Sequence, residues 1–235
     1  MFLRKEEYYY IYKYIHKILL KANPHNLKKA GFPHIQTIRW NSLYHCVKYI
    51  LDHKNLINFQ DEKVQKYFEI IESNVTWKNL LNILETANNF ITLIEEDQAN
   101  LADMMNAFIY TYRQLSGNHS KESECLAQCF LDRFWNDCTL QLPAFAFLLT
   151  KDGLIYISKA PEDEKKVFIE YAIDGLQNYM EKRKLSNFET VLSLFNNYLE
   201  NLPIDWFSDD LSPYENWEQI HNDFGIIACE VFTIP

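Results

Sequence analysis

The sequence predicts a mainly α-helical protein, and three observations lead to this prediction. Apolar residues recur at helical spacing through most of the 235-residue chain. Glycine is scarce, with 5 residues, and proline is modest, with 7, which argues against a loop-rich or all-β fold. Apolar residues make up 48% of the chain, which is enough for a sizeable core. We therefore expect a compact bundle of about eight to nine helices in a single domain, residues 1–235, in which any subdomain boundary falls near residues 140–159.

The chain as far as residue 138 contains a series of segments with apolar residues on one face, a pattern typical of helices that pack on a core. Thr76 is suited as the N-cap of one of them, because its hydroxyl can accept a hydrogen bond from the first turn. Gly117 is expected to end another. The predicted helices cover residues 5–22, 37–53, 61 onward, 76–95, 98–115 and 120–138.

The helical pattern is interrupted between residues 140 and 159. Two short apolar runs lie on either side of Asp152-Gly153, a dipeptide that is typical of tight turns. This arrangement predicts a β-hairpin near residues 145–158. The alternative is a buried helix that is interrupted at Gly153. A further apolar run, residues 226–233, is predicted as a strand that could pair with the hairpin.

Helical signals return after this region. Pro161 suits the first turn of a helix that continues to about Lys184, because proline lacks the N–H group that a first turn leaves unpaired. Ser186 and Glu189 have the spacing of a capping box, in which each side chain binds the backbone of the other, and they predict the start of the next helix.

A last short helix is predicted near the C-terminal end of the chain. Ser212, Pro213 and Glu215 supply a cap, a proline at the first helical position and an acid at the third. The helix is expected to reach about Asn222, with Gly225 ending it.

Charge is unevenly distributed along the chain, whose net charge is −9. Residues 1–58 contain ten Lys/Arg and three acids, a net charge of +7, so residues 59–235 carry −16. The negative total argues against a general role in coating nucleic acid or anionic membranes. The asymmetry indicates internal charge pairing, a charged partner, or both.

The stretch from Asn201 to Pro235 has the most unusual composition, with seven acids, six aromatic residues and no Lys or Arg. It can fold back on the basic N-terminal region of the same chain, or it can present acidic and aromatic groups to a basic protein. In the second case, the expected partner-binding residues are Asp205, Trp206, Asp209, Asp210, Tyr214, Trp217 and Glu218.

The chain lacks the motifs of the common catalytic and cofactor sites. It contains no Gly-x-Ser-x-Gly motif, no P-loop and no dinucleotide-binding glycine motif, so no cofactor is expected. Its size, acidity and lack of motifs are typical of bacterial immunity proteins, which neutralise toxin domains such as nucleases with basic clefts. We therefore expect a non-enzymatic inhibitor of a basic toxin-like domain, without direct nucleic-acid or membrane binding. A helical scaffold or adaptor is an alternative.

One short motif resembles a family signature. The segment Arg39-Trp-Asn-Ser-Leu-Tyr-His45 resembles the Arg/His motif of the HEPN ribonucleases, which are helical bundles. The resemblance implies a metal-independent ribonuclease in which Arg39 binds phosphate and His45 acts as acid and base. The alternative is an ordinary helix that turns its apolar residues inward and keeps Arg39 and His45 at its margin.

The five cysteines indicate reduced thiols in a cytoplasmic protein. Their number is odd, and the N-terminus becomes charged before an apolar run of signal-peptide length. Cys125 and Cys129 are one helical turn apart and are expected to pack as small hydrophobic residues. Glu218 and His221 have the spacing of half a di-iron site, but the sequence contains no second Glu-x-x-His, so no metal site is expected.

Overall fold

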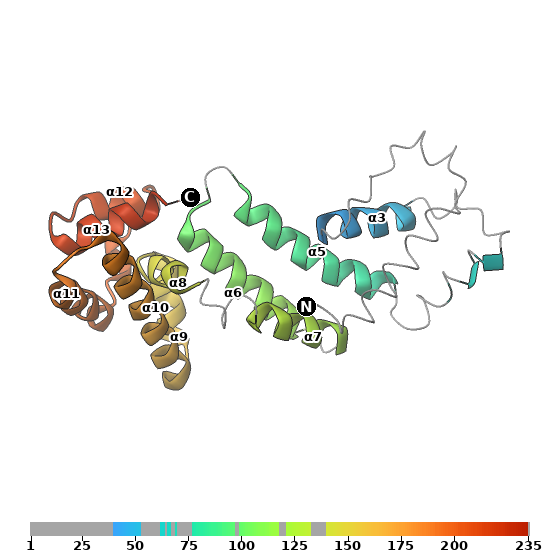
Figure 1. The fold of residues 1–235 in the computed structure, drawn as a ribbon, viewed down its shortest axis with the longest axis horizontal. Coiled ribbons are helices and arrows are strands. Elements are labelled where there is room, and N and C mark those ends of the chain that lie inside the picture. The colour runs from blue at the N-terminus through green and yellow to red at the C-terminus, as the bar shows by residue number, and fades with distance from the viewer. Residues whose placement is uncertain are drawn as a thin grey trace. The chain divides into compact units, whose positions relative to one another are not determined.

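A computed structural model of the protein describes residues 40–52, 77–96, 99–117, 121–132 and 140–234, together with five positions between 62 and 69. The regular elements in these residues are helices, and no strand occurs among them (Figure 1). The helix predicted over residues 5–22 lies outside the described residues, as does most of the one predicted from Asp61. The chain divides into two compact units, residues 1–92 with 111–129 and residues 93–110 with 130–235. The single-domain assignment stays a prediction, and each unit is described by itself.

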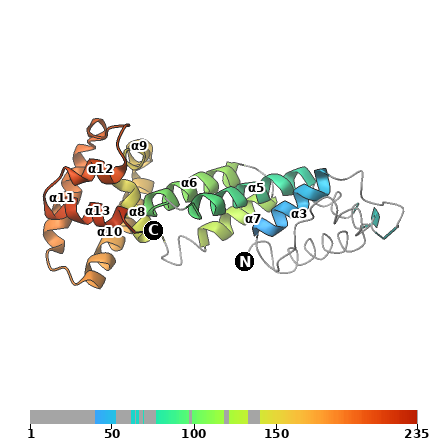
Figure 2. The ribbon, with the colours of Figure 1, turned by 90° about the horizontal axis from the view of Figure 1, so that it is seen from above.

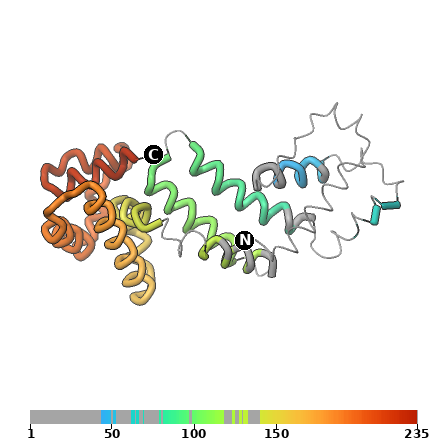
Figure 3. Tube along the Cα trace, in the orientation of Figure 1, coloured from blue at the N-terminus to red at the C-terminus, as the bar shows by residue number. Residues whose placement is uncertain are grey.

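The described part of the first unit is built from helices, which confirm those predicted over residues 37–53, 76–95 and 98–115 and the first part of the one predicted over 120–138 (Figure 3). Tyr44 donates a hydrogen bond to the Glu85 carboxylate at 3.3 Å and joins the first two of these helices. The buried Ser123 hydroxyl donates to the Leu115 carbonyl at 2.7 Å. The helices are α3 (Trp40–Asp52), α5 (Trp77–Ile94, in this unit to residue 92), α6 (Leu101–Gly117, from residue 111) and α7 (Lys121–Phe130, to residue 129).

The second unit is a helical bundle around α8, a short helix that contacts α9, α10 and α13 (Figure 2). Residues 143–148 of α8 are all buried. None of the described helices is both long enough and apolar enough to cross a membrane. The elements that follow residue 140 are α8 (Gln141–Leu148), α9 (Lys151–Lys159), α10 (Glu162–Arg183), α11 (Phe188–Asn201), the 3-10 helix η3 (Ile204–Trp206), α12 (Pro213–Glu218) and α13 (Asp223–Phe232).

The predicted β-hairpin near residues 145–158 is wrong, because this region forms α8 and α9. Because residues 143–148 of α8 are buried on every side of the helix, all of them are apolar and the sequence carries no helical periodicity. The Thr150 hydroxyl caps α9 by accepting a hydrogen bond from the Gly153 amide at 3.1 Å. Gly153 lies in the first turn of α9, where an added Cβ would be 1.9 Å from the Phe147 carbonyl oxygen. The glycine is therefore required by the close approach of two helices, not by a hairpin turn.

The predicted strand over residues 226–233 is also wrong, because residues 226–232 belong to α13 and Thr233 is its C-cap. The Asn222 side chain caps α13 by accepting a hydrogen bond from the Gly225 amide at 2.8 Å. Gly225 therefore lies in the first turn of α13 and does not end α12, which stops at Glu218. A Cβ on Gly225 would lie 2.2 Å from the Ile220 carbonyl oxygen. The connections from α8 to α9 and from α12 to α13 thus share two features: a side-chain N-cap, and a glycine in the first turn that lies against a preceding carbonyl group.

Of the two predicted capping boxes, only the one at α12 is present. The Ser212 hydroxyl accepts from the Glu215 amide at 3.3 Å, and the Glu215 carboxylate accepts from the Ser212 amide at 2.7 Å. The bonds from the Ser212 hydroxyl and amide lower the pKa of Glu215 below its usual value. The box predicted from Ser186 and Glu189 is wrong, because the N-cap of α11 is Asn187, which makes no side-chain cap bond.

The C-terminal end of α8 is buried, and side chains from later helices satisfy its carbonyl groups. A helix leaves its last carbonyl groups without helical partners, and leaving them unpaired in a core costs free energy. The Tyr198 hydroxyl donates to the Leu148 carbonyl at 3.0 Å, and Trp217 Nε1 donates to the Leu149 carbonyl at 2.7 Å. Burial raises the pKa of Tyr198 well above its ordinary value, so this phenol stays a donor at neutral pH.

Candidate partner-binding surface

The residues predicted to bind a partner lie on three consecutive elements of the second unit. Asp205 and Trp206 belong to η3, Asp209 and Asp210 to the loop that follows it, and Tyr214, Trp217 and Glu218 to α12. Five of these residues are exposed, and we term them the acidic C-terminal surface: Asp205, Asp209, Asp210, Tyr214 and Glu218.

Most of the acidic groups on this surface are not used by the fold. The Asp209 carboxylate pairs with Lys151 Nζ at 2.6 Å, although its side chain stays 82% exposed. Asp205, Asp210 and Glu218 are exposed, and their carboxylates make no hydrogen bond or ion pair within the part of the chain that the structure describes. Three carboxylates are therefore available to an external cation.

Trp206 and Trp217 pack beneath this surface, in contact with the core of the unit. Trp217 is only 2% exposed, so the structure places it in the core and not where a partner could reach it. Its ring packs against Tyr198 and Phe224, with centroids 5.2 Å and 5.0 Å away. The half-buried Trp206 ring meets Trp217 edge-on at 5.0 Å. Such edge-to-face contacts stabilise aromatic clusters, and here they anchor η3 to the body of the unit.

A buried asparagine holds the loop between η3 and α12. Asn216 is 3% exposed, and its side-chain oxygen accepts from the Ser208 amide at 3.0 Å. Its amide nitrogen donates to the carbonyl groups of Leu211 at 3.2 Å and Ser212 at 3.0 Å. A buried polar side chain with all of these bonds made restricts the backbone that it binds. Asn216 therefore fixes the loop that carries Asp209 and Asp210, and sequence reasoning missed it because an asparagine in a helix is not distinctive.

Replacing Asn216 with alanine is expected to lower the free energy of unfolding by about 1–3 kcal/mol, because it leaves partly buried backbone groups of the loop without their hydrogen-bond partner. The Ser208 amide should also exchange its hydrogen with solvent faster. Chemical denaturation and hydrogen exchange measure the two effects. The matched control is the exposed Asn196, whose replacement with alanine should change stability by less than about 0.5 kcal/mol. Equal stability of the two variants would show that Asn216 does not hold the loop.

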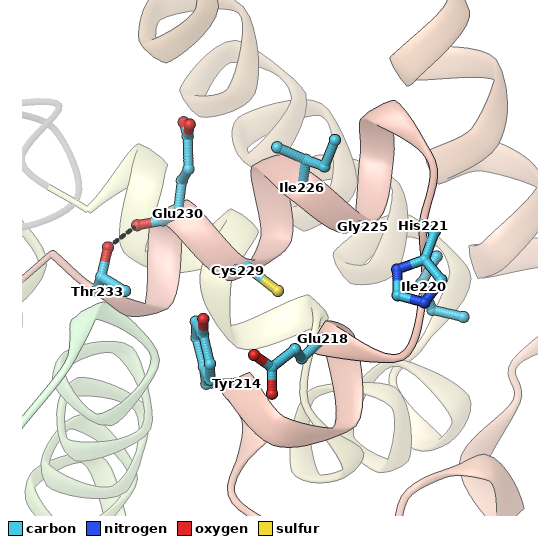
Figure 4. Close-up of a pocket in the computed structure, with 9 residues that line it drawn as sticks. All are labelled: Tyr214, Glu218, Ile220, His221, Gly225, Ile226, Cys229, Glu230 and Thr233. Atoms are coloured by element: carbon cyan, nitrogen blue, oxygen red, sulfur yellow. Dashed lines mark hydrogen bonds between the residues drawn. The ribbon is translucent and has the colours of Figure 1, made fainter.

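A groove of about 400 Å³ lies between α12 and α13 (Figure 4). Tyr214 and Glu218 project into it from α12, and the Cys229 sulfur points toward Glu218 from α13. Tyr214 is 37% exposed, and Ile226, which also lines the groove, is 55% exposed. The groove therefore combines a carboxylate with apolar and aromatic surface. It could not be found from the sequence, because residues 226–233 were predicted as a strand.

The burial and negative charge of the groove change the pKa of Cys229. Burial raises the pKa of the Cys229 thiol above its usual value, and the negative charge of Glu218 raises it further. The thiol is therefore protonated at neutral pH and is a poor nucleophile. His221 and Glu218 line the same groove, as their spacing suggests. Among the described residues, no group of three or more His, Cys, Asp or Glu side chains is arranged to hold a metal ion.

The other sequence hypotheses concern residues that the structure describes only in part. His45 is exposed on α3, and its ring lies 5.2 Å from that of Tyr44. Arg39 lies outside the described residues, so the pairing of Arg39 with His45 stays a prediction. The basic segment before residue 40 and the side chains of Cys125 and Cys129 are also outside them.

Comparisons with known proteins identify no relative. No protein-family model, no curated protein and no solved structure matches the chain.

Proposed function

We propose that the protein is a non-enzymatic binding module whose acidic C-terminal surface docks on a basic protein. The observation that supports this most directly is that, among the described residues, the exposed carboxylates of Asp205, Asp210 and Glu218 make no hydrogen bond or ion pair, while Tyr214 in the same segment is also exposed. Exposed aromatic residues within a charged surface are typical of protein interfaces.

The placement of charge favours a basic partner. No Lys or Arg follows Lys184 in the sequence, so residues 185–235 contain no lysine or arginine that could pair with these carboxylates. Lys151 engages only Asp209 among the described acids of this surface. A surface of one sign attracts a partner of the opposite sign from a distance and speeds their encounter.

The rigidity of the surface supports the same function. The loop is held by Asn216, α12 by its capping box, and η3 by the Trp206 and Trp217 rings. A surface that is already ordered loses less conformational entropy when it binds. This is the property expected of an inhibitor that occupies a basic cleft, as an immunity protein does with a toxin nuclease.

Affinity capture with three forms of the protein tests the proposal. The wild type is compared with Asp205→Asn/Asp210→Asn and with a matched control, Glu170→Gln/Asp174→Asn, on exposed positions of α10. Each double variant has a net charge of −7, since two negative charges are removed from −9. We expect the wild type and the control to retain a basic protein that Asp205→Asn/Asp210→Asn does not retain. An equimolar amount of the wild type should also inhibit the activity of that basic protein. Retention of no basic protein by the wild type, or equal retention by all three forms, would contradict the proposal.

A further inference from the structure

We infer that the groove between α12 and α13 receives an arginine side chain of the basic partner, with its guanidinium group on the Glu218 carboxylate and against the Tyr214 ring. This inference rests on the proposed function and names the chemistry of one contact within it.

The groove has one carboxylate for such a contact. Glu218 is exposed and makes no hydrogen bond among the described residues, and its side chain projects toward α13 (Figure 4). Glu230 also lines the groove, but its carboxylate accepts a hydrogen bond from the Tyr179 hydroxyl at 2.8 Å. In Figure 4 the Glu230 carboxylate points away from Tyr214 and Glu218. The free negative charge of the groove is therefore concentrated at Glu218.

The remaining walls favour arginine over lysine. A guanidinium group is planar, binds a carboxylate through two parallel hydrogen bonds and stacks on an aromatic ring. The Tyr214 ring, one helical turn from Glu218, is exposed for this stacking. The apolar surface of Ile226 can cover the methylene groups of the side chain, as long charged side chains commonly do. A lysine ammonium would use the carboxylate but would leave the ring contact weaker.

Cys229 provides a check on the groove that does not depend on any partner. Because the negative charge of Glu218 contributes to the raised pKa of Cys229, Glu218→Gln should lower that pKa. The thiolate fraction at a fixed pH then rises, and iodoacetamide should alkylate Cys229 faster, by about twofold at pH near 8. Mass spectrometry of the peptide that contains Cys229 measures the rate. The control Glu170→Gln removes the same charge on α10 and should leave the rate unchanged.

The arginine contact is tested with N-acetylarginine amide as the probe and N-acetylcitrulline amide as its uncharged isostere. Titration of the full chain, followed by NMR, should shift the amide signals of Tyr214, Ile226 and Cys229 with arginine, in a saturable way, and should not shift them with citrulline. Glu218→Gln should weaken binding about fivefold, and Glu170→Gln should leave it within about twofold. Tyr214→Leu should weaken binding, whereas Tyr214→Phe, which keeps the ring, should not.

Other results would overturn the inference. Equal shifts with arginine and citrulline, shifts spread over all acidic positions, or unchanged binding by Glu218→Gln would each show that the groove does not select a guanidinium group. The test is also distinct from that of the proposed function. If the arginine probe fails while Asp205→Asn/Asp210→Asn still loses the basic partner, the groove assignment is wrong and the proposed function stands.

Discussion

Replacing Gly175 with alanine is expected to destabilise the protein by about 2 kcal/mol or more, although alanine is the better helix former. Gly175 lies in the middle of α10 where this helix meets the start of α8. An added Cβ would be 2.3 Å from the Gln141 carbonyl oxygen and 2.7 Å from the Leu142 amide nitrogen. Both are backbone atoms, so the two helices must move apart to relieve the contact. Because the interior is close-packed, that movement also loosens the buried face of α8.

The control is the same substitution at Gly117, where nothing lies within 4 Å of an added Cβ. Gly117→Ala should leave the free energy of unfolding unchanged or raise it by up to about 1 kcal/mol, since only helix propensity changes. Urea denaturation of the two variants gives the comparison. If Gly175→Ala proved as stable as the wild type, the close approach of α10 and α8 would be contradicted.

Replacing Trp217 with alanine is expected to cost about 3–5 kcal/mol, the range for removal of a large buried aromatic side chain. The indole is 2% exposed and lies among Tyr198, Trp206 and Phe224. Its Nε1 group also supplies the hydrogen bond to the Leu149 carbonyl at the end of α8. The substitution therefore leaves a cavity and an unpaired buried carbonyl group.

Trp217→Phe separates these two effects, because it keeps most of the ring and removes the donor. It should cost about 1–3 kcal/mol, less than the alanine variant. Denaturation curves followed by circular dichroism measure both. A loss below about 0.5 kcal/mol for Trp217→Ala would mean that Trp217 is a surface residue, as expected of a partner-binding anchor.

The parts of the fold that the sequence predicted are those set by local signals. The apolar stripe of α5 and the capping box of α12 involve residues a few positions apart, and both were found. The errors at α8 and α13 have a shared cause. α8 and α13 are dense in apolar residues, and α9 and α13 each carry a glycine in the first turn that local reasoning assigns to a turn or a helix end. The contacts that require these glycines, Phe147 with Gly153 and Ile220 with Gly225, are visible only in three dimensions.

The candidate site was predicted unevenly for similar reasons. Charge patterning located the acids, because carboxylates without nearby Lys or Arg are usually exposed. It could not distinguish Tyr214, which is exposed, from Trp217, which is buried. It also missed Cys229 and Ile226, because the groove they line exists only when α13 is packed beside α12.

The most direct test of a charge-driven interface is the association rate constant of the captured basic partner, measured by stopped flow at about 50 mM and about 300 mM salt. At low salt, Asp205→Asn/Asp210→Asn should associate about an order of magnitude more slowly than the wild type, because two charges that steer the encounter are lost. Its rate should also depend less on salt. Glu170→Gln/Asp174→Asn, with the same net charge, should associate at close to the wild-type rate. Equal slowing of both double variants would instead assign the effect to the total charge of the protein and would contradict a binding site on the acidic C-terminal surface.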